Sequence, residues 1–318
     1  MALLSHAFNK NERKWQTLQS TKHHGLSPKR TMKHKHLLYL HLSVFLFGFS
    51  ALFARIIELS SLTITFSRVL FSGLFIGLIL LVTKENIKIS NRKHLLLLIA
   101  HGFVLTAHWN AFIFSIQVST VAIGTITMAT FPAFIAIIEP IFFKEKFRII
   151  NLGYAALSML GVGIIAFNLG EGDRNYLLGI IFGLVASITC SVIVLLNRYF
   201  SRKYPAPVIL FYQQGTAAFI MLPIILFLRP TIQVSQLGLL VIYGIALTAI
   251  AQILFIKGLE RIKGVAAGLI SGLEPVYAIL FSLLLLSEVP RVHEIIGGLI
   301  IIFVAALVTI TQSNFQKQ

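Results

Sequence analysis

Long apolar segments separated by short polar breaks run along almost the whole chain. Each segment holds about 20 residues, the length that an α-helix needs to cross about 30 Å of hydrocarbon. The stretch from 95 to 142 is far too long for one crossing, so it is divided at a turn near Val118 and Ser119. The predicted spans are residues 37–57, 62–82, 95–117, 120–142, 150–168, 177–197, 207–228, 236–257, 264–286 and 294–312. The pattern therefore predicts an all-α integral membrane protein with ten transmembrane helices.

Composition agrees with lipid as the main solvent. Hydrophobic residues make up 57% of the chain and charged residues 12%, and the mean hydropathy is +0.86. A soluble domain of this length does not need so much apolar material to fill its core. The net charge of +16 does not indicate nucleic acid as a partner, because the basic residues lie in the breaks and the N-terminal tail.

Lys and Arg are distributed unevenly between the two sets of alternate breaks. The set that includes the N-terminal tail holds 22 of them, and the other set holds only Arg174, Arg229 and Arg291. Basic residues gather in cytoplasmic loops. The sequence therefore predicts a multi-pass protein of the cytoplasmic membrane with both termini in the cytoplasm.

Residues 1–36 form a basic segment without the apolar region of a signal peptide. We interpret this segment as a mobile cytosolic tail, with contact to anionic lipid headgroups as the alternative. The one cysteine, Cys190, lies inside an apolar span, so no disulfide framework is expected.

Two stretches of the chain share a pattern at a constant spacing. Residues 132–145 (PAFIAIIEPIFFKE) and 275–288 (PVYAILFSLLLLSE) each begin with proline and end with glutamate, offset by 143. The same offset relates Arg55, at the end of the first span, to Arg198, at the end of the sixth. The spacing predicts a duplicated unit.

The predicted repeats cover residues 37–168 and 177–312, with five helices each. Because five is odd, the second copy enters the membrane from the opposite side, and the two halves are inverted relative to each other. Two inverted halves can open a central site first to one side and then to the other.

These features together resemble the EamA family of the drug/metabolite transporter (DMT) superfamily, from about Leu37 to Thr311. The resemblance rests on the duplicated layout, the ARII and LNRY span ends at Arg55 and Arg198, the pair Ser67-Arg68, and the endings Lys144-Glu145-Lys146 and Ser287-Glu288. It implies export or exchange of small organic solutes across a bacterial inner membrane, through a cavity lined mostly by spans 1, 3, 4, 6, 8 and 9. The basic tail, His101 and His108 depart from the family pattern.

Ionisable groups at membrane depth are the principal candidates for the site, because each costs several kcal/mol unless it is paired or hydrated. Glu274, just before Pro275, lies near the middle of its span and is predicted to contact substrate or protons. The alternative is a protonated carboxyl that bonds a neighbouring helix. Arg68 lies about 6 Å from the middle of its span. It is predicted to bind an anionic group of the solute, with a structural ion pair or snorkelling as alternatives.

His108 and Trp109 are predicted to line the same cavity near the middle of the third span, and His101 lies two turns away on the same face. A proton relay and an interhelical hydrogen bond are both open for these histidines. Gln252 and Tyr277 are candidate neutral contacts.

Glu139 is placed near the cytoplasmic end of its span. It is predicted to line the inner vestibule, with pairing to Lys144 or Lys146 as the alternative.

The sequence thus predicts a secondary transporter of an amino acid, an amine or a similar amphoteric metabolite, working by alternating access. We find no catalytic constellation and no metal-ligand spacing, so no enzyme activity, metal or cofactor is expected. Glycines in the fifth and tenth spans indicate a packing face or a homodimer face. The alternatives are a polytopic membrane enzyme and a membrane scaffold that does not transport.

Overall fold

The protein is described by a computed structural model, which places residues 28–119, 124, 127–128, 130–165, 175–286 and 292–314. The predictions that lie outside the described residues concern residues 1–27, Arg174, Ser287, Glu288, Arg291, Lys317 and the side chain of Arg55. The chain divides into residues 1–32 and a compact unit from Lys33 onward, and this second unit forms the helical bundle.

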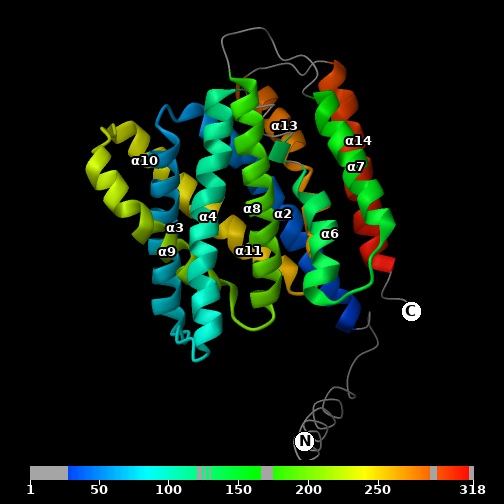
Figure 1. Cartoon of the computed structure of the whole chain (residues 1–318), viewed down its shortest axis with the longest axis horizontal. Coiled ribbons are helices and arrows are strands. Elements are labelled where there is room, and N and C mark those ends of the chain that lie inside the picture. Colours follow the sequence, from blue (N-terminus) through cyan, green and yellow to red (C-terminus); the bar gives the residue numbers. More distant parts are fainter. Residues whose placement is uncertain are drawn as a thin grey trace, which may run out of the picture. The chain divides into compact units, whose positions relative to one another are not determined.

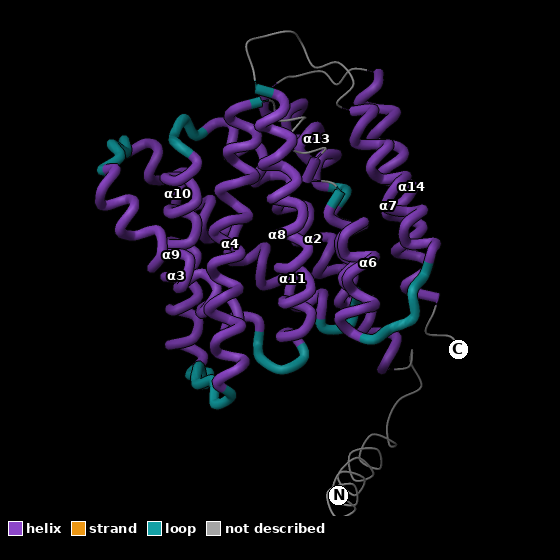
Figure 2. The backbone as a smooth tube through the Cα atoms, in the orientation of Figure 1, coloured by secondary structure: helices purple, strands orange, loops and turns teal. Residues whose placement is uncertain are grey.

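Every regular element among the described residues is a helix, which confirms the predicted all-α class (Figures 1 and 2). In chain order the elements are α2 Pro28–Ile56, α3 Ser61–Thr83, α4 Arg92–Val118, α6 Phe131–Phe143, α7 Ile149–Ile165, α8 Tyr176–Ser201, α9 Ala206–Leu228, α10 Val234–Gly244, η1 Ile245–Ile250, α11 Ala251–Leu259, α12 Gly264–Ser271, α13 Glu274–Leu286 and α14 Val292–Asn314.

Five of these helical segments are long and apolar enough to cross a bilayer. They are Ser61–Thr83, Arg92–Val118, Leu177–Ser201, Ala206–Leu228 and Val234–Leu259. In hydrocarbon a helix satisfies its backbone hydrogen bonds internally, so apolar runs of this length adopt a helical conformation.

The first helix, α2, begins nine residues before the predicted start at residue 37. Residues 28–36 are therefore helical, whereas the sequence predicted them as part of the N-terminal tail.

Two predicted spans are irregular in the structure. The segment predicted as 236–257 contains the π-helix η1 between α10 and α11, and the segment predicted as 264–286 is interrupted at Gly272 and Leu273. Gly272 caps α12, and Pro275 has no N–H to donate to the carbonyl of Ser271. The proline signal seen in the sequence therefore coincides with a break one residue before Glu274.

The two halves of the chain carry equivalent elements. Helices α6 and α13 begin at Phe131 and Glu274, which are offset by the 143 residues found in the sequence. Helices in corresponding positions of the two halves also pack together, namely α3 with α9 and α7 with α14. The α7–α14 pair is seen on the right of Figure 1.

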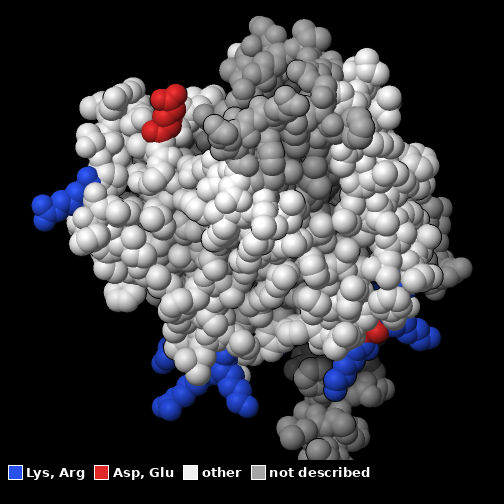
Figure 3. All heavy atoms as spheres, turned by 45° about the horizontal axis from the view of Figure 1, so that its top comes forward, with Lys and Arg blue, Asp and Glu red and all other residues white. Residues whose placement is uncertain are grey.

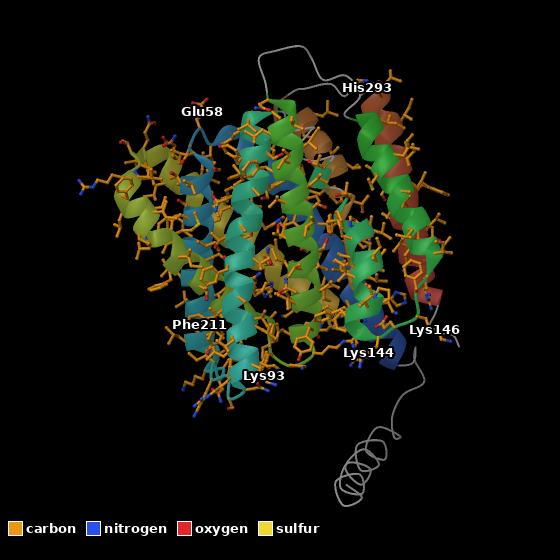
Figure 4. The ribbon with its side chains drawn as sticks, viewed as in Figure 1. Glu58, Lys93, Lys144, Lys146, Phe211 and His293 are labelled. Carbon is orange, nitrogen blue, oxygen red and sulfur yellow. The ribbon has the colours of Figure 1, made fainter. Side chains whose placement is uncertain are left out.

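Charged side chains mark the two ends of the bundle. Lys93, Lys144 and Lys146 lie at one end, which we call the basic end, and Glu58 and His293 lie at the other (Figure 4). On the face shown in Figure 3, most Lys and Arg side chains gather at the lower margin, beyond a broad uncharged surface. This segregation is the pattern that the positive-inside rule describes.

Helix α4 packs against both α8 and α9, and a small residue makes the second contact possible. A Cβ atom on Gly102 would lie 2.5 Å from Cβ of Thr216 and 2.8 Å from the backbone oxygen of Gln213. Neither atom belongs to the flexible end of a side chain. Gly102 therefore sets the distance between α4, which carries Trp109, and α9.

Replacing Gly102 by alanine should separate α4 from α9 and lower stability by about 1–3 kcal/mol, the usual effect of overpacking. The measurement is the midpoint of thermal unfolding of the purified protein in detergent. Gly215→Ala on α9 is the matched control, because a Cβ at Gly215 meets nothing within 4 Å. Equal midpoints for the two variants would contradict the close contact.

Candidate functional site

Arg68 is a buried cation in the apolar helix α3, with 6% of its surface exposed. Its Nε donates a hydrogen bond to Oγ1 of Thr248, at 3.2 Å. Among the described residues no carboxylate lies within salt-bridge distance of its guanidinium. Because arginine keeps its charge in proteins, other groups must stabilise Arg68.

Two aromatic rings enclose the guanidinium of Arg68. Its Cζ lies 4.1 Å from the ring centre of Trp109 on α4 and 4.4 Å from that of Tyr243 on α10. A cation over an aromatic face is stabilised by about 2 kcal/mol or more when it is desolvated. The planar faces leave the edge of the guanidinium, where its N–H groups point, available for hydrogen bonding.

The π-helix η1 positions the hydrogen-bond acceptor of Arg68. Oγ1 of Thr248 donates to the carbonyl of Tyr243 at 2.8 Å, a link across five residues. Just before η1, Gly244 allows α10 to approach α3, since a Cβ there would lie 2.5 Å from Cβ of Phe71. Short π segments inside helices are frequent at functional sites.

Glu274 lies in the first turn of α13, directly after the break in the chain, and its side chain is partly buried. It is close enough to Arg68 for the two charges to interact, yet they form no salt bridge. A carboxylate is favoured at a helix N-terminus by the helix dipole. Arg68 and Glu274 are therefore opposite charges that interact electrostatically without forming a salt bridge.

The two histidines of α4 contact different helices. His108 donates through Nδ1 to the carbonyl of Ala186 on α8, at 2.9 Å, and its ring stacks on Phe112. Nε2 of His101 lies 3.0 Å from Nε2 of Gln213 on α9. Both histidines thus make the interhelical hydrogen bonds that were one of the two predicted roles.

The two neutral candidates lie in α11 and α13. Gln252 is buried, and Tyr277 packs edge-to-face on Phe45 of α2 with ring centres 5.4 Å apart. Neither makes a hydrogen bond or ring contact with Arg68 or Trp109. The structure brings Arg68 and Trp109 into contact and leaves the assignment of Gln252 and Tyr277 a prediction.

A second cluster of charges lies at the basic end. The carboxylate of Glu139 accepts from Nη1 of Arg198 at 2.6 Å, and from the backbone N–H groups of Gly264 and Val265 at 2.5 and 3.0 Å. The partner of Glu139 is therefore Arg198 and the N-terminus of α12, rather than Lys144 or Lys146. Arg198 is 1% exposed and Glu139 3% exposed, so both charges are buried and paired.

Glu145 extends this cluster toward the surface. It accepts from Nη2 of Arg198 at 2.6 Å and from Nζ of Lys263. Partial burial alone would raise the pKa of the Glu145 carboxyl, but the hydrogen bonds from Lys263 and Arg198 outweigh it and hold the pKa below its ordinary value of 4.5.

Sequence reasoning assigned no site role to four residues of these clusters, Tyr243, Thr248, Arg198 and Lys263. Thr248 follows Gly244 within an apolar span, and Arg198 shares its offset with Arg55, so weak signals existed. The π-helix that directs Thr248 toward Arg68 leaves no mark in the hydrophobic pattern.

Metal binding has no support among the described residues. No group of three or more His, Cys, Asp or Glu side chains in the described part of the chain could hold a metal ion.

Comparisons with known proteins agree on one class. The model of the EamA-like transporter family matches residues 34–167 and 177–310. An uncharacterized transporter of Archaeoglobus fulgidus is 25% identical over 82% of this chain and 91% of its own length. An uncharacterized transporter of Synechocystis is 23% identical over 85% of each chain, and the uncharacterized transporter YdfC of Bacillus subtilis is 25% identical over 70% of this chain and 74% of its own.

A solved crystal structure has the same fold, with a TM-score of 0.75. It is 17% identical to this chain, and the match covers 88% of this chain and 98% of the other.

The lowered pKa of Glu145 predicts a stability difference that depends on pH. The carboxylate contributes fully above pH 4.5, and this contribution is lost as the pH falls below that value. Glu145→Gln should thus be less stable than the parent at pH 7, by no more than ~1 kcal/mol because Glu145 is partly exposed. The gap should narrow in acid, measured as thermal midpoints in detergent.

Glu85→Gln is the control for this series, since Glu85 is exposed and makes no ion pair with the described residues. A gap between Glu145→Gln and the parent that stayed the same at every pH would contradict the ion pairs of Glu145.

Proposed function

The chain belongs to the EamA-like transporter family, and from this premise we propose that it moves small amphoteric metabolites, such as amino acids or amines, across the cytoplasmic membrane by alternating access. In this proposal the protein exports its solute or exchanges it for another. The observation that carries the proposal is Arg68, a buried cation held by two aromatic faces and one hydroxyl, with the charge of Glu274 nearby but not in contact.

The charge arrangement supports an amphoteric solute. Arg68 can bind a carboxylate through two parallel N–H groups, the geometry that guanidinium favours. Glu274 can accept from an amine, and the ring of Trp109 adds an apolar face beside Arg68. A solute with both groups would satisfy the buried charge of Arg68 and the partly buried carboxyl of Glu274, which form no salt bridge with each other.

The proposed architecture is ten helices in two inverted repeats, covering residues 37–168 and 177–312. The 143-residue offset between the starts of α6 and α13 supports it. So does the packing of α3 on α9 and of α7 on α14, because helices equivalent under a two-fold axis meet at that axis. The basic end is then the cytoplasmic side, with both termini there.

The other proposed contacts are His108, Gln252 and Tyr277, with protons as a second cargo. His108 is buried in α4, one residue before Trp109, and it donates through Nδ1 to the carbonyl of Ala186. In this proposal Glu274 contacts either the amine of the solute or a coupled proton.

The proposal predicts that Arg68→Met and Glu274→Gln reduce flux in reconstituted vesicles by at least about tenfold. Each removes a charged hydrogen bond of about 1.5–3 kcal/mol. Thermal midpoints should be preserved in Arg68→Met, because the loss of the ring and hydroxyl contacts is offset when a charge no longer has to be buried. Flux of labelled amino acids, amines and organic acids is measured in both directions, with Arg92→Met and Glu85→Gln as matched controls on exposed residues.

The two variants should also separate the solute classes. Arg68→Met should affect amino acids more than amines, and Glu274→Gln should do the reverse if Glu274 binds the amine. If Glu274 carries protons instead, Glu274→Gln should abolish proton-driven uptake of every solute and spare exchange. Unchanged flux in both variants would refute the site, and a parent protein that moves no amphoteric solute would refute the solute class.

A further inference from the structure

The charge cluster at the basic end joins elements from both halves of the chain. Glu139 and Glu145 come from the C-terminal part of α6 and the loop after it, and Arg198 comes from the last turn of α8. Lys263 and the N-terminus of α12 complete it. We call Glu139, Glu145, Arg198 and Lys263, with the first two amides of α12, the basic-end latch.

Hydrogen bonds and ion pairs connect the members of the latch. The Glu139 carboxylate accepts three hydrogen bonds from the second half of the chain, and Arg198 donates to two carboxylates while its Cζ lies 4.2 Å from the ring centre of Phe143. Removing one member of a buried ion pair leaves the other charge uncompensated. The buried pair of Arg198 and Glu139 is therefore either formed or strongly disfavoured, as a two-state element requires.

The latch is linked directly to the proposed solute site. Helix α12 runs eight residues, or about 12 Å, from the amides that bind Glu139 to the break at Gly272. Glu274 follows immediately after that break. A displacement of α12 at its first turn is thus transmitted by a short rigid helix to the chain segment that carries Glu274.

From this geometry we propose that the basic-end latch is the inner gate of the transporter: it closes the basic end in this conformation and must separate for solute to leave or enter there. The proposal rests on alternating access as the proposed function. Glu139 is its central member, because it bonds both to Arg198 and to the first two amides of α12. Charge compensation by Glu139 then favours the state that is closed at this end.

Val194 offers a probe of the closed state. It is buried one turn before Arg198 on α8, and its Cγ1 would lie 3.4 Å from a Cβ on Gly264. A cysteine at this position, in a Cys190→Ala background that removes the natural thiol, should be shielded by the closed latch. Labelling by a membrane-impermeant maleimide from the basic-end side reports opening, and it requires no solute.

Glu139→Gln should speed labelling of Val194→Cys at least about tenfold, a factor that corresponds to 1.4 kcal/mol. Gly264→Ala should do the same without changing any charge, because its Cβ would lie 2.7 Å from Oε1 of Glu139. Glu85→Gln and Gly215→Ala are the matched controls and should label at the parent rate.

Chemical rescue distinguishes a gate from misfolding. In Glu139→Ala, added formate can occupy the position of the lost carboxylate between Arg198 and α12, so it should slow labelling toward the parent rate. Fast labelling that formate does not slow, or folded latch variants that label at the parent rate, would overturn the gate. The labelling assay needs no solute. If the Arg68 and Glu274 variants left flux unchanged, the proposed solute site would be refuted, but the labelling result on the latch would still hold.

Discussion

A charge buried in an apolar bundle must be compensated, and the two buried arginines of this protein meet that demand differently. Arg198 donates through Nη1 to Glu139 and through Nη2 to Glu145, so two carboxylates of the protein compensate its charge. Arg68 has a hydroxyl, two aromatic faces and a carboxylate at a distance. A salt bridge to carboxylates of the protein suits a contact that holds a conformation, and a buried charge without a salt bridge among the described residues suits a group that binds a ligand. The contrast between the two arginines underlies the assignment of one cluster to closure and the other to binding.

Backbone irregularities occur where these groups need positioning. The π-helix directs Thr248 to Arg68, and the break at Gly272 places Glu274 in the first turn of α13. Each interrupts regular hydrogen bonding inside an apolar span, which is unfavourable unless neighbouring groups satisfy the backbone. In the π segment the Thr248 hydroxyl donates to the carbonyl of Tyr243, so the same group satisfies the backbone and binds the cation.

The sequence predicted most of the helices because hydrophobic length alone determines a span in lipid. The repeat was also visible, since proline and glutamate recur at the offset that relates α6 to α13. The sequence predicted how deep Arg68 and Glu274 lie in their spans, but it did not predict which side chains they contact. Glu139 was paired with nearby lysines in the predicted alternative, whereas its partner Arg198 is 59 positions away. Tyr243 was overlooked because an aromatic residue in an apolar span carries no signal until the helix facing it is known.

Duplication and divergence have separate roles in this fold. The equivalent starts of α6 and α13 place Phe131 in the first half where Glu274 stands in the second. Phe131 is buried in the apolar core, whereas Glu274 interacts electrostatically with Arg68. If both positions carried a carboxylate, the two negative charges would repel each other, and more positive charge would be needed at this depth to compensate them. The two halves thus share a helix start at this position, but the carboxylate stands in the second half. In the proposed site this gives one positive and one negative group, so a solute with unlike ends has a single favoured orientation.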